Sequence, residues 1–126
     1  MRVWLLGLAR SFGWAFAGVW HMLRRQRNAQ IHSLITILVI VFGVVLQVNA
    51  AEWVALVLAI ALVLALEALN TALEAVVDLA SPQIHPLAKH AKDTAAGAVL
   101  IGAIGAAIAG CIIFLPKLWT LVRSWL

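Results

Sequence analysis

The sequence predicts a single all-α membrane domain over residues 1–126, built from an N-terminal amphipathic surface helix and three transmembrane helices. Hydrophobic residues make up 65% of the chain and charged residues only 11%, which lies far outside the composition of soluble domains. A soluble domain of this length could not bury so much apolar surface. The formal net charge of +4 is therefore assigned to Lys and Arg at a membrane surface and not to nucleic acid, for which no solvated basic face is left.

Residues 1–28 are expected to form a helix that lies in the plane of the membrane surface. Large apolar side chains recur in this segment at steps of three or four residues, and basic side chains occupy its other faces. Tryptophan combined with arginine on such a helix is typical of interfacial helices. An ordinary core helix is the alternative, but the chain has no soluble core for it to join. The apolar set is Trp4, Leu8, Phe12, Phe16, Val19 and Leu23, and the basic set is Arg2, Arg10, His21, Arg24 and Arg25.

Three later stretches, near residues 31–49, 53–79 and 94–119, are each long enough to cross a hydrocarbon core of about 30 Å, which takes about 20 residues. The connection between the first two contains no Lys or Arg, so the positive-inside rule places the first helix and the 80–93 connection in the cytoplasm. Lys117 and Arg123 lie on the outer side and depart from the rule, but the inner segments hold the larger excess. The inner basic residues are Arg24, Arg25, Arg27, Lys89 and Lys92.

Tryptophans and small residues give two further expectations for these spans. Amphipathic rings gather at both membrane interfaces, and small residues repeated every four positions let helix backbones approach closely. Small residues scattered by chance on a lipid-facing surface are the alternative for the second pattern. The outer tryptophans are Trp53, Trp119 and Trp125, the inner ones are Trp4, Trp14 and Trp20, and the small residues are Ala98, Gly102, Ala106 and Gly110.

The second span carries a polar stripe on one face of an otherwise apolar helix. At about 100° per residue, Glu67, Asn70, Thr71, Glu74 and Asp78 fall within a sector of roughly 100°. A carboxylate at membrane depth costs about 2.5–3.5 kcal/mol on insertion scales, so it usually marks a functional site with partners. With a rise of about 1.5 Å per residue from the outer interface, the stripe passes from the inner leaflet at Glu67, through the boundary at Glu74, to the cytosol at Asp78.

A cationic segment follows the stripe directly. Pro82 is expected to end the second span, and Pro86 to occupy the first turn of the next helix. Side chains spaced three and four residues apart then form a cluster opposite the carboxylates. A solvated interfacial helix whose lysines meet anionic lipid headgroups is the alternative. The cluster consists of His85, Lys89, Lys92 and Asp93.

Carboxylates at the hydrocarbon boundary beside a basic rim suit the transfer of an anionic group from a soluble donor to a lipid hydroxyl. Paired oxygen ligands would hold Mg²⁺ together with substrate phosphates, and a deeper carboxylate would accept the hydroxyl proton. The sequence has no GxxxxGK[ST] loop, no HRD or DFG motif and no zinc-type Cys/His spacing. A kinase of this kind would therefore hold phosphates without a glycine-rich loop.

Two hypotheses without catalysis stay open at this point. In the first, the carboxylates form a proton or cation path through a multispan membrane protein, although no acidic residue lies in the outer half of any span apart from Glu52 at the mouth. In the second, the stripe only joins helices through hydrogen bonds, for which Asn70 and Thr71 would be enough.

Two blocks of sequence, residues 67–78 and 85–93, resemble the small prokaryotic integral-membrane diacylglycerol and undecaprenol kinases, and residues 27–32 extend the likeness to nearly the whole chain. The resemblance implies a homotrimer in the bacterial inner (cytoplasmic) membrane. Its active sites, shared between neighbouring protomers and open to the cytoplasm, would phosphorylate a lipid alcohol from MgATP. Residues 85–89 resemble the undecaprenol kinase branch more closely, so undecaprenol is favoured over diacylglycerol as acceptor.

The same resemblance assigns roles to individual residues. Glu67 corresponds to the general base for the lipid hydroxyl, Glu74 to a metal ligand, and Asn70 to a polar support beside them. Gln26 stands where well-known members carry a second glutamate ligand. An amide still offers Mg²⁺ an oxygen, but it removes one full charge. The residues that correspond to nucleotide-contacting positions are Gln83, His85, Lys92 and Asp93, with Asp78 beside them on the cytosolic side.

Overall fold

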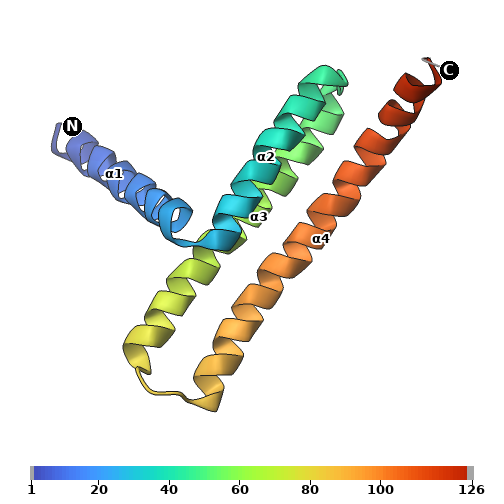
Figure 1. The fold of residues 1–126 in the computed structure, drawn as a ribbon. Coiled ribbons are helices and arrows are strands. Elements are labelled where there is room, and N and C mark those ends of the chain that lie inside the picture. The colour runs from blue at the N-terminus through green and yellow to red at the C-terminus, as the bar shows by residue number, and fades with distance from the viewer. Residues whose placement is uncertain (1, 125–126) are drawn as a thin grey trace.

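The computed structural model describes residues 2–124. They form four helices, α1 (Arg2–Arg25), α2 (Arg27–Val45), α3 (Ala50–Ala80) and α4 (Pro86–Arg123). In Figure 1, α3 and α4 run side by side as a long antiparallel hairpin, α2 packs along the half of α3 that follows the α2–α3 turn, and α1 points away from this bundle. Within the described residues, α2, α3 and α4 are long and apolar enough to cross a membrane, as predicted.

The first helix ends earlier than predicted. The backbone at Gln26 is extended (φ −99°, ψ 116°), so α1 stops at Arg25 and α2 begins at Arg27, whereas the sequence suggested one helix over 1–28 and a span from residue 31. Gln26 is the N-cap of α2 and makes no side-chain capping bond. The Gln26 side chain is therefore not used in capping α2 and can make a contact with another helix.

The connection between α3 and α4 is also shorter than predicted. It comprises residues 81–85 alone, because residues 86–93 already belong to α4 and not to an 80–93 connection. Pro86 occupies the first turn of α4, as predicted, and the ring nitrogen Nδ1 of the N-cap His85 accepts a hydrogen bond from the Leu87 N–H at 3.2 Å. The end of α3 at Ala80 agrees with the stop expected from Pro82.

At the other end of the bundle, residues 46–49 form a tight turn in which Gln47 adopts a left-handed φ of 51°. The Asn49 side chain accepts from the Glu52 N–H at 3.0 Å, and the Glu52 carboxylate accepts from the Asn49 N–H at 2.7 Å, which is a complete capping box for α3. The same carboxylate pairs with Lys117 of α4 at 3.0 Å. Lys117, one of the two basic residues expected on the outer side, is thus held by an acidic partner.

A small apolar core joins the three long helices near this turn. Val48, Leu56 and Ile113 are buried there, with Val39, Trp53 and Phe114 packed around them. Elsewhere many large apolar side chains are exposed along the same helices, among them Leu62, Leu69, Ile101 and Ile108. Surface of this kind requires hydrocarbon or another protein chain to cover it.

Close backbone approach occurs at two glycines. A Cβ added to Gly102, one of the four small residues singled out in the sequence, would lie 2.7 Å from Leu66 Cδ1 of α3, which agrees with the predicted backbone approach. A Cβ added to Gly43 of α2 would lie 2.6 Å from the indole ring of Trp53. Trp53, expected only as an interface anchor, is therefore also a packing residue, while Trp125 lies outside the described residues.

We predict that Gly43→Ala destabilises the bundle. A methyl group at Gly43 would clash with the rigid indole of Trp53, which cannot move aside as the flexible end of Leu66 could beside Gly102. Overpacking of this kind costs about 1–3 kcal/mol. This exceeds the gain of about 0.5–1 kcal/mol from replacing glycine within a helix. Unfolding of the purified protein in detergent measures the change. Gly18→Ala is the control, because a Cβ there meets nothing within 4 Å; equal stability of the two variants would contradict the prediction.

Candidate functional site

The polar stripe of α3 is graded from a buried end to an exposed end. Glu67 is 1% exposed and Asn70 7%, whereas Thr71 and Glu74 are half-buried and the Asp78 side chain is 68% exposed. Glu67 and Asp78 are separated by eleven residues, a rise of roughly 16 Å along the helix. The stripe therefore connects the interior of the bundle to solvent, in the order expected from the sequence.

Glu74 is the centre of a cluster that joins the α1–α2 bend to α3. Gln26 Nε2 donates to Glu74 Oε2 at 3.2 Å, and Asn70 Nδ2 donates to Glu74 Oε1 at 3.1 Å. Both carboxylate oxygens are thus occupied by amide groups. The structure brings Gln26 to Asn70 and Glu74; the sequence had placed Asn70 and Glu74 on one helix face and had linked Gln26 to them only through the family resemblance.

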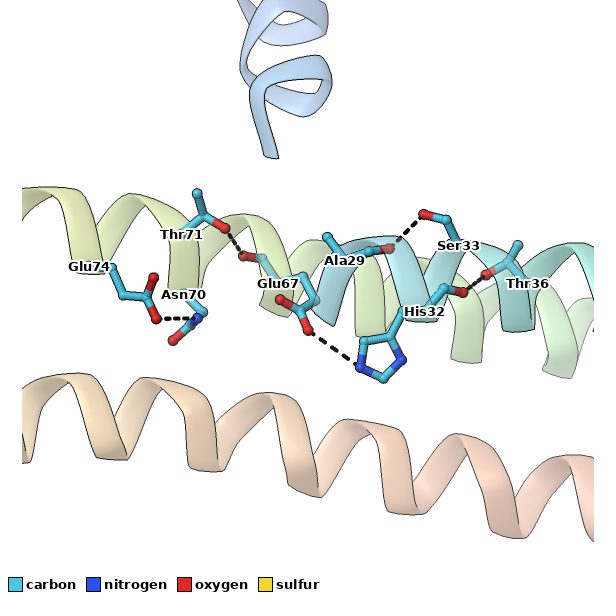
Figure 2. A network of polar contacts seen from close by, with 8 residues as sticks. All are labelled: Ala29, His32, Ser33, Thr36, Glu67, Asn70, Thr71 and Glu74. Carbon is cyan, nitrogen blue, oxygen red and sulfur yellow. Dashed lines mark hydrogen bonds and ion pairs between the residues drawn. The ribbon is translucent and has the colours of Figure 1, made fainter. Parts of the chain in front are cut away.

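Glu67 has a partner that the sequence did not assign to it. His32 Nε2 lies 3.4 Å from Glu67 Oε1, an ion-pair contact when the imidazole is protonated (Figure 2). The Thr71 hydroxyl, although on the same stripe, donates to the Glu67 backbone carbonyl at 2.8 Å and not to the carboxylate. In the sequence, His32 was an ionisable residue near the start of an apolar span and the last residue of the 27–32 segment that resembles the family, but neither signal gave it a partner.

The exposed end of the stripe faces the cationic cluster, as expected. Lys92 pairs with Asp78 across the two helices, while Asp93 pairs with Lys89 on its own helix. These side chains line a hollow of about 280 Å³ between the end of α3, the connecting residues and the start of α4. The hollow is lined by all four residues that the resemblance assigned to nucleotide contact, Gln83, His85, Lys92 and Asp93. His85 combines this position with its role as the helix cap.

The side chains around Glu74 carry oxygen atoms that suit Mg²⁺ once the amides turn, since both amides now direct their N–H groups at the carboxylate. Within residues 2–124, no group of three or more His, Cys, Asp or Glu side chains is arranged to hold a metal. A Mg²⁺ site does not require three such side chains, since the ion is commonly bound by one or two carboxylates together with waters and substrate phosphates. In the same described range, Asn70 Oδ1 is a buried oxygen without a hydrogen-bond partner beside Glu74. Glu74 with the amide oxygens of Asn70 and Gln26 would fit such an ion.

Comparisons with known proteins show which proteins this chain resembles. Residues 13–114 match the family model described as prokaryotic diacylglycerol kinase. The chain is 44% identical over 109 residues to an undecaprenol kinase of Bacillus subtilis, covering 86% of this chain and 89% of that protein. It is 48% identical over 113 residues to a diacylglycerol kinase of Synechocystis, covering 89% and 65% of the two chains. With a diacylglycerol kinase of Escherichia coli the identity is 32% over 106 residues, covering 84% and 87%.

We predict that Gln26→Glu makes the stability of the protein depend on Mg²⁺. The substitution replaces an N–H donor to Glu74 by a second carboxylate, and a hydrogen bond to a charged group is worth about 1.5–3 kcal/mol. The variant should therefore unfold at a lower temperature than the parent in EDTA, and Mg²⁺ should raise its unfolding midpoint more than that of the parent.

Gln30→Glu is the matched control for this prediction. It adds the same charge one turn further along α2, where the side chain is exposed and its amide donates to the Arg24 carbonyl at 3.3 Å. An equal response of the two variants to Mg²⁺ would show that the ion does not act at Glu74.

Proposed function

The chain belongs to the prokaryotic diacylglycerol kinase family, and we propose that it transfers the γ-phosphoryl group of MgATP to the hydroxyl of a membrane lipid alcohol. The observation that carries this proposal is the graded stripe: a buried carboxylate at one end, a carboxylate bound by two amide side chains in its middle and a cationic hollow at its exposed end. A lipid hydroxyl would reach the buried carboxylate from the membrane, and a nucleotide would reach the cationic hollow from water.

The chemical step follows from these positions. The acceptor oxygen forms a bond to the γ-phosphorus, the bond between that phosphorus and the β–γ bridging oxygen breaks, and ADP leaves with the bonding electrons. Glu67 takes the hydroxyl proton as general base. Phosphoryl transfer needs little covalent chemistry from a protein beyond positioning and charge stabilisation.

At the exposed end, the chain's own groups would position the nucleotide. Lys92 and Lys89 supply positive charge for phosphate oxygens, and both are now paired with carboxylates that a nucleotide would compete with. Gln83 and His85 lie in the same hollow. Glu74, Asn70 and Gln26 would hold Mg²⁺ between the hollow and Glu67; when bound, the ion neutralises charge on the phosphates.

We place the active site on the cytoplasmic side of the bacterial inner membrane. The support is the positive-inside rule together with the basic residues at the Gln26 bend and at the start of α4. Helix α1 would lie in the interface, because Trp4, Phe12 and Phe16 are 70%, 58% and 71% exposed on it. A homotrimer, which the resemblance implies, would cover part of the apolar surface of α2, α3 and α4.

A conduction path has less support than a kinase. Glu52, the acidic residue at the outer mouth, is already used by the capping box and by Lys117. The remaining acidic residues of the sequence, Glu67, Glu74, Asp78 and Asp93, all belong to the other end. A proton or cation entering from outside would find no further carboxylate before Glu67.

Lipid phosphorylation tests the proposed function directly. Purified protein with radiolabelled ATP and Mg²⁺ should transfer label to a lipid alcohol, and EDTA should stop the transfer. In a panel of undecaprenol, diacylglycerol and ceramide we expect the highest kcat/KM with undecaprenol, in line with the Bacillus subtilis relative. Label in none of these lipids would refute the kinase proposal, whereas a preference for diacylglycerol would refute only the choice of acceptor.

We predict that Glu67→Gln lowers kcat by roughly 100- to 10,000-fold, the range of general-base contributions. Nucleotide binding should be retained, because the hollow that would receive it lies roughly 16 Å further along α3. Rates and nucleotide affinity are measured on the same preparation. Thr71→Val is the control, since its hydroxyl is bonded within the helix. Loss of nucleotide binding in the Glu67 variant would overturn its assignment as base.

A further inference from the structure

Glu67 is the most deeply buried polar side chain of the described bundle, and its carboxylate has few polar contacts. Glu67 Oε1 is buried without a hydrogen-bond partner in residues 2–124. The nearby Thr71 hydroxyl donates to the Glu67 backbone carbonyl and not to the carboxylate. The amides of Gln26 and Asn70 go to Glu74 instead. The imidazole of His32, 3.4 Å away, is the group that contacts the carboxylate from another helix.

His32 also belongs to an apolar groove of about 350 Å³ between α2, α3 and α4. The helices alternate in direction, so the lining residues can be ordered along the groove. One end is formed by His32, Val63 and Ala103, and the other by Val39, Leu56 and Leu115. The end with His32 is the end nearest Glu67, because Val63 precedes Glu67 by about one turn of α3.

The lining of the groove is suited to a hydrocarbon chain and not to a polar molecule. Apart from His32, its side chains are aliphatic, aromatic or small, with Thr36 and Cys111 as the weakly polar exceptions. The Thr36 hydroxyl donates to the His32 carbonyl at 2.8 Å, so it is satisfied within α2. His32 is therefore the most polar side chain that lines the groove, and it lies where the groove meets the buried carboxylate.

We infer that His32 is a positioning residue for Glu67: its imidazole holds the carboxylate at the end of the apolar groove, where the hydroxyl of the acceptor lipid reaches it. The inference rests on the lipid-kinase activity proposed above. In this role His32 Nε2, now 3.4 Å from Glu67 Oε1, would hold that oxygen, and the second carboxylate oxygen would take the proton of the acceptor. A carboxylate without this partner would lose its polar contact from α2, and misplacement by about 1 Å can cost roughly 100-fold in rate.

Two amide substitutions separate positioning from packing. In His32→Gln the amide nitrogen stands near the place of Nε2 and can donate to Glu67, whereas in His32→Asn the same group is one methylene shorter and falls short. Both variants are neutral and polar, so only their reach differs. We expect His32→Gln to keep most of the wild-type kcat and His32→Asn to lose roughly 100-fold, with the KM for MgATP unchanged in both.

Ser33→Ala and Glu67→Asp complete the experiment. Ser33 is the next residue on α2, its hydroxyl donates to the Ala29 carbonyl at 2.7 Å, and its removal should leave kcat unchanged. Glu67→Asp draws the carboxylate away from the imidazole, so His32→Asn should lower kcat little further in that background than Glu67→Asp does alone.

The outcomes separate the two proposals. Wild-type protein that phosphorylates no lipid refutes the proposed function. Active wild-type protein with equal rates for His32→Gln and His32→Asn refutes the role of His32, as do independent, multiplying losses for His32→Asn and Glu67→Asp. Thermal unfolding in detergent accompanies each rate, and a kcat loss that tracks a lower unfolding midpoint instead of the reach of the amide also overturns the inference.

Discussion

A polar side chain on a membrane-spanning helix must find its partner within the protein, because hydrocarbon offers none. The arrangement of the helices around α3 follows from this constraint. Helix α2 brings His32 to Glu67, the bend before it brings Gln26 to Glu74, and α4 brings Lys92 to Asp78. Each carboxylate of the stripe is thus matched by a side chain from a different segment. The polar contacts and the packing of the three long helices therefore specify the same arrangement.

The spacing of the carboxylates along one helix gives them different environments. Glu67 is enclosed, Glu74 is held by two amides, and Asp78 meets solvent and a lysine. A helix keeps these distances nearly fixed, so the difference does not depend on loop conformation. Side chains of similar chemistry can therefore serve a membrane-side and a water-side task within roughly 16 Å.

Periodicity and local signals were sufficient for much of this architecture. The polar stripe, the helix stop before Pro82 and the start at Pro86 all depend on neighbours within one or two turns, which the sequence displays directly. The bend at Gln26 was misplaced because no Pro or Gly marks it. The contact of His32 with Glu67 was not predicted, since its two residues lie on different helices and pairing between helices has no local signature.

Gln26 shows how one neutral residue changes what such a site requires. Two glutamates facing each other, the arrangement that the family resemblance implies at positions 26 and 74, repel and need a cation between them. An amide at position 26 donates to Glu74, so the cluster assembles without an ion. The same amide must turn its oxygen inward, or withdraw, before it can help to bind Mg²⁺, and it brings one negative charge less. Phosphate oxygens of the nucleotide would then supply the missing charge, so that metal and nucleotide would bind most favourably together.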